Sequence, residues 1–427
     1  MSASPEAAAR TKPWPARLPF YYGWVILPAA SLALFASGPG QTFAVSVFVD
    51  PLIDEFGWSR TSVSGLYTAG SLTAAGTMFG VGRLMDRFGA RAILAIVGAL
   101  MGLAAIWMSK VNSQLELYAG FAALRIFGQG SMTLIPTALV AVWFLRRRGK
   151  LTALTGLGMM AAQVTFPPLI HYLIARIGWR DAWLVLAVIV WAVALPVAVL
   201  FVRRSPESVG LHPDGAAAAT GSDGVTEGVA TDWPLGMAMR TRAFWLILVA
   251  GSSQSLISTA LVFHQADVLS TRGVGAGVSA AVLSVMGPAT FIGVMSAGVL
   301  ADRYANRYLI AIGQLMLMSA IAMVMCLTQS WQAVVYGGVL GFASGFTITA
   351  SAVIWPNYFG RRHLGSIRGV ATTMVLAAAA LGPLPLSLGF DLAGSYTTVL
   401  GFALLLPAAC GVMAYIARPP TLAAPAS

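Results

Sequence analysis

Charged residues are scarce in this chain. Only 10% of its 427 residues are Asp, Glu, Lys or Arg, whereas 58% are hydrophobic. The mean hydropathy is +0.78. A soluble domain of this length cannot hide so much apolar surface from water. The composition therefore predicts an integral membrane protein.

Other absences exclude whole classes of protein. The two cysteines, Cys326 and Cys410, lie in apolar stretches, so neither a disulfide framework nor a cysteine-based metal site is expected. The chain has no Gly-x-x-x-x-Gly-Lys-Ser/Thr phosphate loop, which excludes a nucleotide-driven pump. No metal-ligand cluster, nucleophile/base spacing or sizeable soluble segment stands out. We therefore expect no enzyme, no bound metal and no cofactor.

Long apolar runs fill most of the chain. A helix needs about 20 residues to cross a bilayer. Runs of that order lie near 22–49, 61–83, 90–109, 115–143, 150–174, 181–202, 243–269, 277–300, 308–327, 331–358, 365–390 and 396–417. The sequence thus predicts an all-α membrane fold of twelve transmembrane helices. It predicts two pseudo-symmetric six-helix bundles, 21–202 and 241–418, joined by a polar, Gly-rich linker at 203–240.

The distribution of basic residues predicts the orientation. With both termini in the cytoplasm, 20 of the 26 Lys and Arg residues lie on the inner side and 5 on the outer side. Arg368, at the start of the eleventh apolar run, is counted on the inner side. Residues 1–20 and 419–427 are predicted to be cytoplasmic tails, because no early apolar segment ends in a cleavage site. We expect a monomer in the inner membrane. The basic residues sit where membrane topology places them, so no nucleic-acid partner is needed.

A charged pattern occurs once in each half. The pattern Gly-x-x-x-Asp-Arg-x-x-x-Arg recurs at a displacement of 216 residues, as Gly82, Asp86, Arg87 and Arg91 and as Gly298, Asp302, Arg303 and Arg307. A small residue near a helix end permits close helix approach. The charges at the membrane edge can bond partner groups or helix ends between the halves. The pattern therefore predicts an inner gate. The alternative is that these charges only anchor the loops at the lipid headgroups.

Twelve spans with this duplicated loop pattern resemble the major facilitator superfamily. The segments Tyr22–Val25, Glu55–Arg60 and Gly389–Tyr396 are similar to those of its monocarboxylate transporter and oxalate/formate antiporter branch. The resemblance implies secondary-active movement of a small organic solute, most simply a monocarboxylate or related anion, by proton symport or exchange. A drug or metabolite exporter of the same superfamily is the alternative.

One departure from that branch concerns the substrate. The resemblance implies an Arg four residues before the motif Gly of the eighth helix and an Asn four residues earlier. Val294 and Thr290 occupy these positions here. A carboxylate moved by this chain must therefore meet a cation elsewhere, or be held by hydrogen bonds and apolar contacts.

Arg125 and His264 are the basic side chains that the sequence offers in place of the missing arginine. Arg125 lies within the fourth span, where a charge is costly without a partner or a wet cavity. His264, near the outer end of the seventh span, has Asp267 one helical turn on, a pair that can bind a proton. We predict that Arg125 and His264 face a shared central cavity. The alternatives are a structural Arg125 and a solvated His264–Asp267 pair.

Uncharged polar residues in the spans complete the predicted site. Buried amides and hydroxyls need partners, and either substrate or a neighbouring helix supplies them. These candidates are Gln41, Tyr67, Gln129, Gln254 and Asn357. Glycines that recur every four residues predict close-packed helix faces instead; they are Gly76 and Gly80, and Gly337, Gly341 and Gly345.

Overall fold

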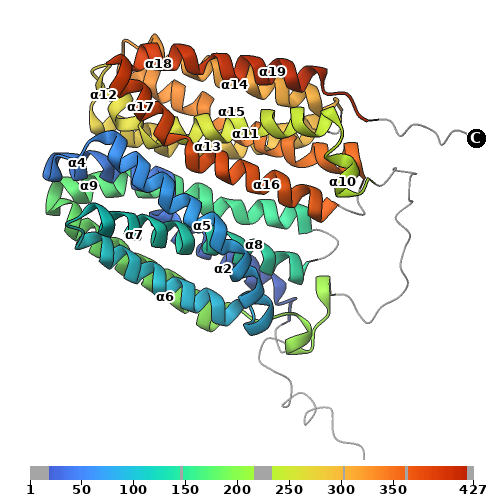
Figure 1. Ribbon diagram of the computed structural model, residues 1–427. Helices are drawn as coiled ribbons and strands as arrows, with labels where there is room; N and C mark the ends of the chain where they lie inside the picture. The colour runs from blue at the N-terminus through green and yellow to red at the C-terminus, as the bar shows by residue number, and fades with distance from the viewer. Residues whose placement is uncertain (1–18, 145–147, 216–232, 302, 361–363, 421–427) are drawn as a thin grey trace, which may run out of the picture. The chain divides into compact units, whose positions relative to one another are not determined.

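The computed structural model describes residues 19–144, 148–215, 233–301, 303–360 and 364–420 (Figure 1). All regular structure in these ranges is helical, as predicted. Eight helices of the described chain are long and apolar enough to cross a membrane. Most of the predicted N-terminal tail, much of the predicted linker and most of the C-terminal tail fall outside these ranges.

The chain forms two compact units. Unit 1 comprises the described residues within 1–41, 76–162 and 173–223, and unit 2 those within 42–75, 163–172 and 224–427. Helices α5 (Arg60–Phe88) and α9 (Arg148–Pro196) each contribute residues to both units. The predicted boundaries of the two bundles therefore remain a prediction.

Unit 1 is held together by close backbone approaches. A Cβ atom on Gly40 would lie 2.5 Å from the Leu124 carbonyl oxygen, and one on Gly158 would lie 1.9 Å from that of Ser31. Only glycine fits at such contacts. Besides parts of α5 and α9, this unit contains α2 (Gly23–Ala36), η2 (Gly38–Gly40), α6 (Ala90–Ser109), α7 (Gln114–Leu124), the π-helical η4 (Arg125–Ser131), α8 (Met132–Trp143), η5 (Val197–Phe201), η6 (Glu207–Val209) and η7 (Pro213–Gly215).

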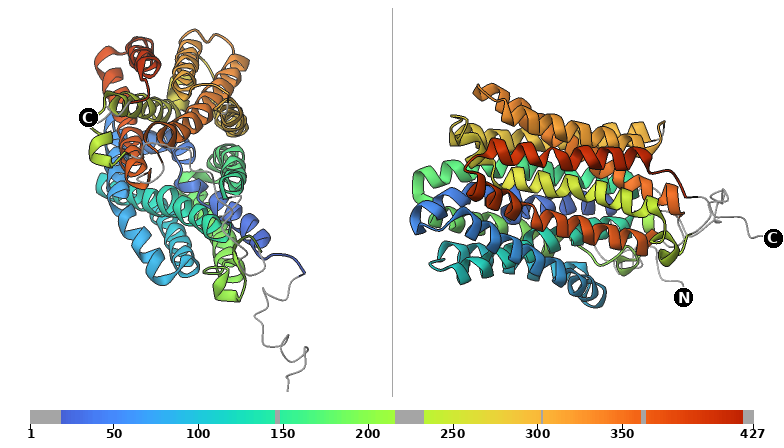
Figure 2. Two further views of the ribbon diagram at one scale, coloured as in Figure 1. Left: turned by 90° about the vertical axis from the view of Figure 1, so that its right-hand side faces the viewer. Right: turned by 45° about the horizontal axis from the view of Figure 1, so that its top comes forward.

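Unit 2 contains most of the long helices. Figure 2 shows α11, α13, α14, α15, α16 and α19 running roughly side by side. The helices of this unit, besides parts of α5 and α9, are α3 (Thr42–Val45), η3 (Ser46–Phe48), α4 (Val49–Phe56), α10 (Leu235–Ala238), α11 (Arg242–Phe263), α12 (Gln265–Ser270), α13 (Ala276–Ala301), α14 (Asn306–Met325), α15 (Ser330–Phe359), α16 (Leu364–Leu381), α17 (Pro383–Ala393), α18 (Tyr396–Ala403) and α19 (Leu405–Ile416).

Several predicted spans are interrupted helices. Gly38-Pro39-Gly40 forms a 3-10 turn, after which the chain continues through α3, η3 and α4. The seventh span breaks at His264, between α11 and α12, and the eleventh breaks at Gly382, between α16 and α17. Proline removes a backbone donor and crowds the preceding turn, so breaks at Pro39 and Pro383 follow from the sequence.

Helices α13 and α15 pack with their backbones nearly in contact. Cβ atoms on Gly337, Gly341 and Gly345 would lie 2.8, 2.5 and 2.0 Å from carbonyl oxygens of α13. These glycines confirm the predicted close-packed face. The same prediction is wrong for Gly76 and Gly80, because a Cβ atom on either would meet no described atom within 4 Å.

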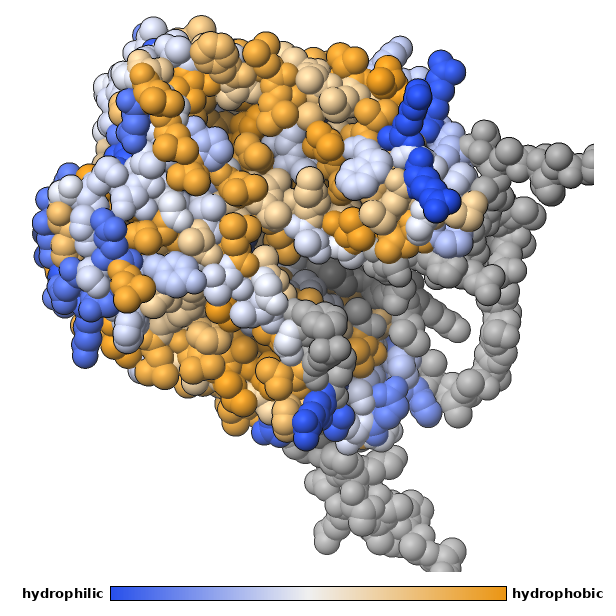
Figure 3. Space-filling model, in the orientation of Figure 1, coloured by the Kyte–Doolittle hydropathy of each residue, from blue (hydrophilic) through white to orange (hydrophobic). Residues whose placement is uncertain are grey.

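The surface suits a bilayer. Hydrophobic residues cover much of the visible sides of the helices, and hydrophilic ones gather towards the helix ends (Figure 3). Large apolar side chains such as Leu315, Leu392 and Val412 are exposed. Lipid chains are the natural neighbours of such a surface.

We expect Gly345→Ala to lower the melting temperature in detergent, because the added methyl group would overlap the Thr290 carbonyl oxygen. Overpacking of this kind costs about 1–3 kcal/mol. Gly338→Ala is the matched control, since its Cβ atom would lie 3.9 Å from the nearest neighbour, on Val285. Equal melting temperatures for the two variants would contradict the packing described.

Candidate functional site

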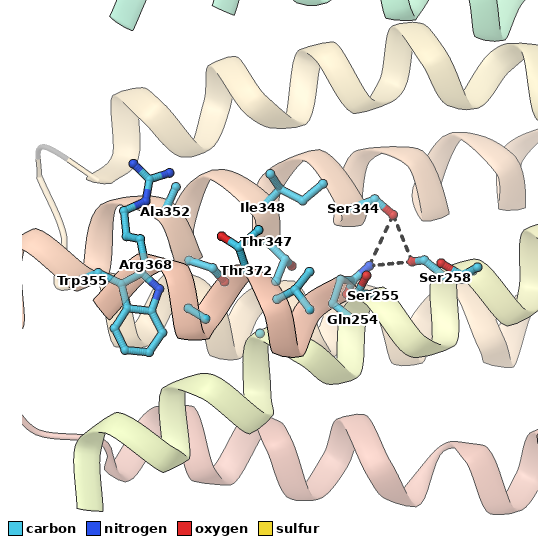
Figure 4. A pocket seen from close by; sticks show the side chains of 15 residues that line it. Gln254, Ser255, Ser258, Ser344, Thr347, Ile348, Ala352, Trp355, Arg368 and Thr372 are labelled. Atoms are coloured by element: carbon cyan, nitrogen blue, oxygen red, sulfur yellow. Dashed lines mark hydrogen bonds between the residues drawn. The ribbon is translucent and has the colours of Figure 1, made fainter. Parts of the chain in front are cut away.

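A pocket of about 360 Å³ lies within unit 2. Its surface is mainly apolar, and we call it the polar pocket because amide, hydroxyl and guanidinium groups are among its lining. Figure 4 shows Gln254, Ser258 and Ser344 at one end, Arg368 and Trp355 at the other, and threonines between them. Helices α11, α15 and α16 supply its lining: Gly251, Gln254, Ser255, Ser258, Thr259, Ser344, Thr347, Ile348, Ser351, Ala352, Trp355, Arg368, Ala371, Thr372 and Val375.

A hydrogen-bonded triangle closes one end of the pocket. The Gln254 amide nitrogen donates to the Ser258 hydroxyl at 2.9 Å and to the Ser344 hydroxyl at 3.3 Å (Figure 4). The two hydroxyl oxygens are 3.1 Å apart, and Ser344 donates to the Leu340 carbonyl at 2.8 Å. The Ser258 proton therefore points to Ser344, and the amide joins α11 to α15.

The side-chain amide of Gln314, on α14, also binds α11. Gln314, fully buried on α14, donates to the Ala250 carbonyl at 2.8 Å and accepts from Ser253 at 3.1 Å. Both bonds come from the helix interior rather than its ends, so they fix the rotation of α11. This places Gln254, one turn after Ala250, on the pocket side.

Arg368 supplies the positive charge of the pocket. It lies one turn after the start of α16, is exposed, and extends its guanidinium group away from the Trp355 ring (Figure 4). No acidic residue is among those that line the pocket. Sequence reasoning counted Arg368 among the inner basic residues, although it falls within the eleventh apolar run. The signal that could have singled it out is the apolar stretch that follows it, from Gly369 to Leu381.

Thr290, at the position where the resemblance implies an Asn, takes part in helix packing. Thr290 donates to the Gly341 carbonyl at 3.0 Å, and its own carbonyl lies against Gly345. Neither Thr290 nor Val294 lines the pocket.

A second polar cluster joins α5 to α12 within unit 2. Arg60 lies 2.7 Å from Asp50 and 3.1 Å from Asp267. Tyr396 donates to the other oxygen of Asp267, and its ring stacks on Phe390 at 4.3 Å. The side chains of Arg60 and Asp267 are largely buried. Two carboxylates therefore share one guanidinium group.

His264 is completely buried and lies outside the polar pocket. Its Nε2 atom is 2.9 Å from the Pro383 carbonyl oxygen and 3.4 Å from the Ser64 hydroxyl. A carbonyl only accepts, so Nε2 carries the proton. The structure thus brings His264 to the two helix breaks of unit 2, while Asp267 bonds Arg60.

The other predicted polar candidates have separate surroundings. Tyr67 shares a 2.8 Å hydrogen bond with Thr42 in unit 2, whereas Gln41 in unit 1 donates to Ser37 at 3.1 Å. Gln129 lies in η4, and Asn357 is exposed near the end of α15. Of the five, Gln254 lines the polar pocket.

Arg125 is buried in unit 1, where it opens the π-helical segment η4. Such segments often occur at functional sites. His264 belongs to unit 2. The shared cavity of Arg125 and His264 remains a prediction.

Each copy of the duplicated loop motif makes contacts within its own unit in the described chain. Arg91 donates to the Val199 carbonyl at 2.7 Å, Arg87 lies over the Phe88 ring, and Arg307 bonds the Tyr308 hydroxyl at 2.8 Å. A Cβ atom on Gly298 would meet no described atom within 4 Å, so the close approach predicted there is not seen. Arg303 is exposed. The surroundings of Gly82, the side chain of Asp86 and all of Asp302 lie outside the described part. The gate role remains a prediction.

Long apolar helices around a polar pocket define a multi-pass membrane protein of the transporter class. The model of the Major Facilitator Superfamily matches residues 30–383. The chain belongs to this superfamily, whose members carry small solutes across membranes.

Relatives of known name share modest identity. The oxalate:formate antiporter of Oxalobacter formigenes is 27% identical over 255 residues, which is 60% of this chain and 57% of that protein. The chain thus matches little more than half of that relative. Monocarboxylate transporter 6 of Homo sapiens is 30% identical over 38% of this chain and 32% of its own length. The uncharacterized transporter YhjX of Escherichia coli (strain K12) is 23% identical over 81% of this chain and 83% of its own.

The fold is also that of a solved transporter. A bacterial homolog of the human lysosomal transporter Spinster, in an inward-facing and unoccupied conformation, superposes with a TM-score of 0.71. It covers 93% of this chain and 97% of that one at 14% identity, a likeness of fold alone.

We expect Gln254→Leu to lower the melting temperature in detergent, because Ser258 and Ser344 lose their amide donor. Loss of a partner by buried polar groups costs about 1–3 kcal/mol. Ser255→Ala, which alters the same pocket outside the triangle, should change it much less. A wild-type melting temperature for Gln254→Leu would rule out a structural role of the triangle.

Proposed function

We propose that this chain is a secondary-active transporter of a small organic anion, most simply a monocarboxylate, by proton symport or exchange. The observation that carries the proposal is Arg368, one guanidinium group in a hydroxyl-rich pocket whose lining has no acidic residue. A carboxylate leaving water needs a compensating cation or several donors. A planar guanidinium group binds it with two parallel hydrogen bonds.

The remaining lining fits a small solute. Seven of the fifteen lining residues are Ser or Thr. Ile348, Val375 and the Trp355 ring add an apolar side for a short carbon chain. A volume of about 360 Å³ is at the lower end of the range of roughly 300–1,000 Å³ that is usual for small-molecule sites.

The names of two relatives agree with this chemistry. The antiporter carries oxalate and formate in its name, and the other relative is a monocarboxylate transporter. Because both share at most 30% identity over part of the chain, they support the class of solute and leave its identity open.

The proposed transport is by alternating access of two bundles, 21–202 and 241–418. The 20 basic residues of the expected inner side favour cytoplasmic termini in the inner membrane. In this topology Arg368 lies near the cytoplasmic end of the pocket, and the Gln254 triangle lies near the middle of the membrane. The duplicated loops would then form the inner gate.

An exporter of apolar metabolites or drugs is the second candidate. A separate pocket of about 290 Å³ in unit 2 favours it, because Leu256, Ile257, Pro385, Leu386 and Phe402 are among its apolar lining residues. A protein that moves neutral or cationic amphiphiles and ignores carboxylates would support this function over the first.

We expect Arg368→Gln to raise the half-saturating carboxylate concentration in proteoliposomes by tenfold or more, since a hydrogen bond to a charged group contributes about 1.5–3 kcal/mol. Arg368→Lys should have a half-saturating concentration between those of the wild type and Arg368→Gln, because an ammonium group keeps the charge and loses the two-bond geometry. Uptake of labelled formate, acetate, lactate and oxalate, with and without a pH gradient, measures this.

Arg240→Gln is the matched control, because Arg240 is exposed and lies outside the pocket. It should transport like the wild type. Wild-type carboxylate affinity in Arg368→Gln would show that the anion binds elsewhere. No transport of any carboxylate by the wild type would contradict the function proposed.

A further inference from the structure

Three side chains of α5 face three of the α11–α12 segment in register. Arg60 pairs with Asp267 at 3.1 Å, and Ser64 lies 3.4 Å from His264. The rings of Tyr67 and Phe263 follow, with centroids 4.5 Å apart. Positions 60, 64 and 67 recur at four and three residues, so they share one face of the α5 helix. We call these three pairs the α5–α12 ladder.

The ladder changes in chemistry along its length. Its first pair is ionic, its second is a polar contact and its third is aromatic. Seven residues of α5 separate Arg60 from Tyr67, which is about 10 Å of helix. An ionic pair thus lies at the helix end, where water reaches it, and an apolar pair lies deeper. The polar contacts therefore lie at the end of the helix, and the aromatic contact lies behind them.

Only some of these contacts must break for the helices to part. Asp50 and Arg60 lie close in sequence, on either side of the turn at Gly57 that ends α4, so they move together. Asp267 is distant in sequence and is also fixed by Tyr396. A nearby contact between Thr61 and Asp391 likewise joins α5 to α17. Separation therefore breaks the bonds of Arg60 to Asp267 and of Thr61 to Asp391.

His264 connects the ladder to two helix breaks. It ends α11, and its Nε2 proton is shared between the Pro383 carbonyl at the start of α17 and Ser64 on α5. The Ser64 hydroxyl donates its proton to the Arg60 carbonyl oxygen at 2.8 Å, so its oxygen accepts the hydrogen bond from His264. The short helices α12, α17 and α18 gather at the same end of unit 2 (Figure 1). They can tilt at the breaks while the long helices stay packed.

We propose that the α5–α12 ladder is the gate at the end of the protein opposite the duplicated loop motif, and that Arg60–Asp267 is its latch. The inference rests on the proposed alternating access, since a carrier must close one entrance while the other is open. The ladder is closed in this structure. It also accounts for the membership of residues 42–75 in unit 2 together with the C-terminal half.

Ser71 provides a reporter beneath the ladder. It lies one turn beyond Tyr67 on the same face of α5, is 5% exposed, and its hydroxyl has no hydrogen-bond partner among the described residues. Ser71→Cys therefore loses no bond and adds a thiol behind the gate. Cys326, which is exposed, and Cys410, which is buried, are first replaced by Ser and Ala.

The experiment measures labelling of Ser71→Cys by a membrane-impermeant maleimide on intact cells, with no substrate present. We expect Arg60→Gln and Asp267→Asn each to raise the labelling rate about tenfold, because each removes one charge-assisted bond from the closed state. Tyr396→Phe, which keeps the ring on Phe390, should raise it about threefold.

Arg272→Gln is the matched control. It removes a positive charge from the same end of unit 2, but Arg272 bonds Thr397 rather than α5. Unchanged labelling in the three ladder variants, or an equal rise in Arg272→Gln, would overturn the gate. Tyr396→Phe keeps the test open if the charge variants fail to fold. Labelling only in inside-out vesicles would place the ladder on the cytoplasmic face and overturn the assignment.

The outcome is separable from the proposed substrate. Labelling uses no solute. A protein that labels as expected but moves no carboxylate would support the proposed gate and contradict the proposed function. The reverse result, carboxylate transport with unchanged labelling, would be compatible with the proposed role of Arg368 and would contradict the proposed gate.

Discussion

The free energy of placing a charge in a low-dielectric membrane is the constraint on which this structure depends. A charge near the membrane is kept only with a partner or in contact with water. Arg60 is shared by two carboxylates, and Arg180 binds the carbonyls of Ser109 and Val111 at 3.0 Å each. Arg368 instead faces a pocket lined by hydroxyl groups. We propose that Arg368 binds an anion from outside the protein.

Close helix packing makes that pocket specific. Backbone contact along the glycines of α15 fixes α13 against it, and Gln314 sets the rotation of α11. The serine and amide groups of the triangle are then placed by rigid helices rather than by loops. The helix breaks at Gly382 and His264 allow the short helices of the proposed gate to tilt. A rigid site and a mobile gate are what alternating access requires.

Much of the fold could be predicted from the sequence, because the bilayer acts on local composition. Apolar runs of fixed length predict spans. The prolines at 39 and 383 account for observed helix breaks, whereas Pro167-Pro168 lies inside helix α9. The glycines at 337, 341 and 345 predict a packed face, while the same spacing at Gly76 and Gly80 does not produce one. Spacing permits a contact, but the neighbouring helix decides whether it forms.

The site was less predictable, because its residues are brought together by contacts between distant segments and not by local composition. Gln254 could be found because a buried amide stands out in an apolar helix. Arg368 could not, because an arginine at a helix end reads as a cytoplasmic charge until its neighbours on other helices are known. His264 and Asp267 were expected to act as a pair, yet they bond different partners, Pro383 and Arg60. Contacts between distant segments depend on helix rotation, which no local pattern encodes.

The central claim is that the pocket of α11, α15 and α16 binds the carboxylate of a small anion through Arg368. The most direct measurement is a crystal structure of the protein with a brominated monocarboxylate, located by the anomalous scattering of bromine. The account predicts a bromine peak inside the pocket and carboxylate density within hydrogen-bond distance of the Arg368 guanidinium group. A fully occupied ligand bound beside Arg125 or His264, with the Arg368 pocket empty, would contradict it.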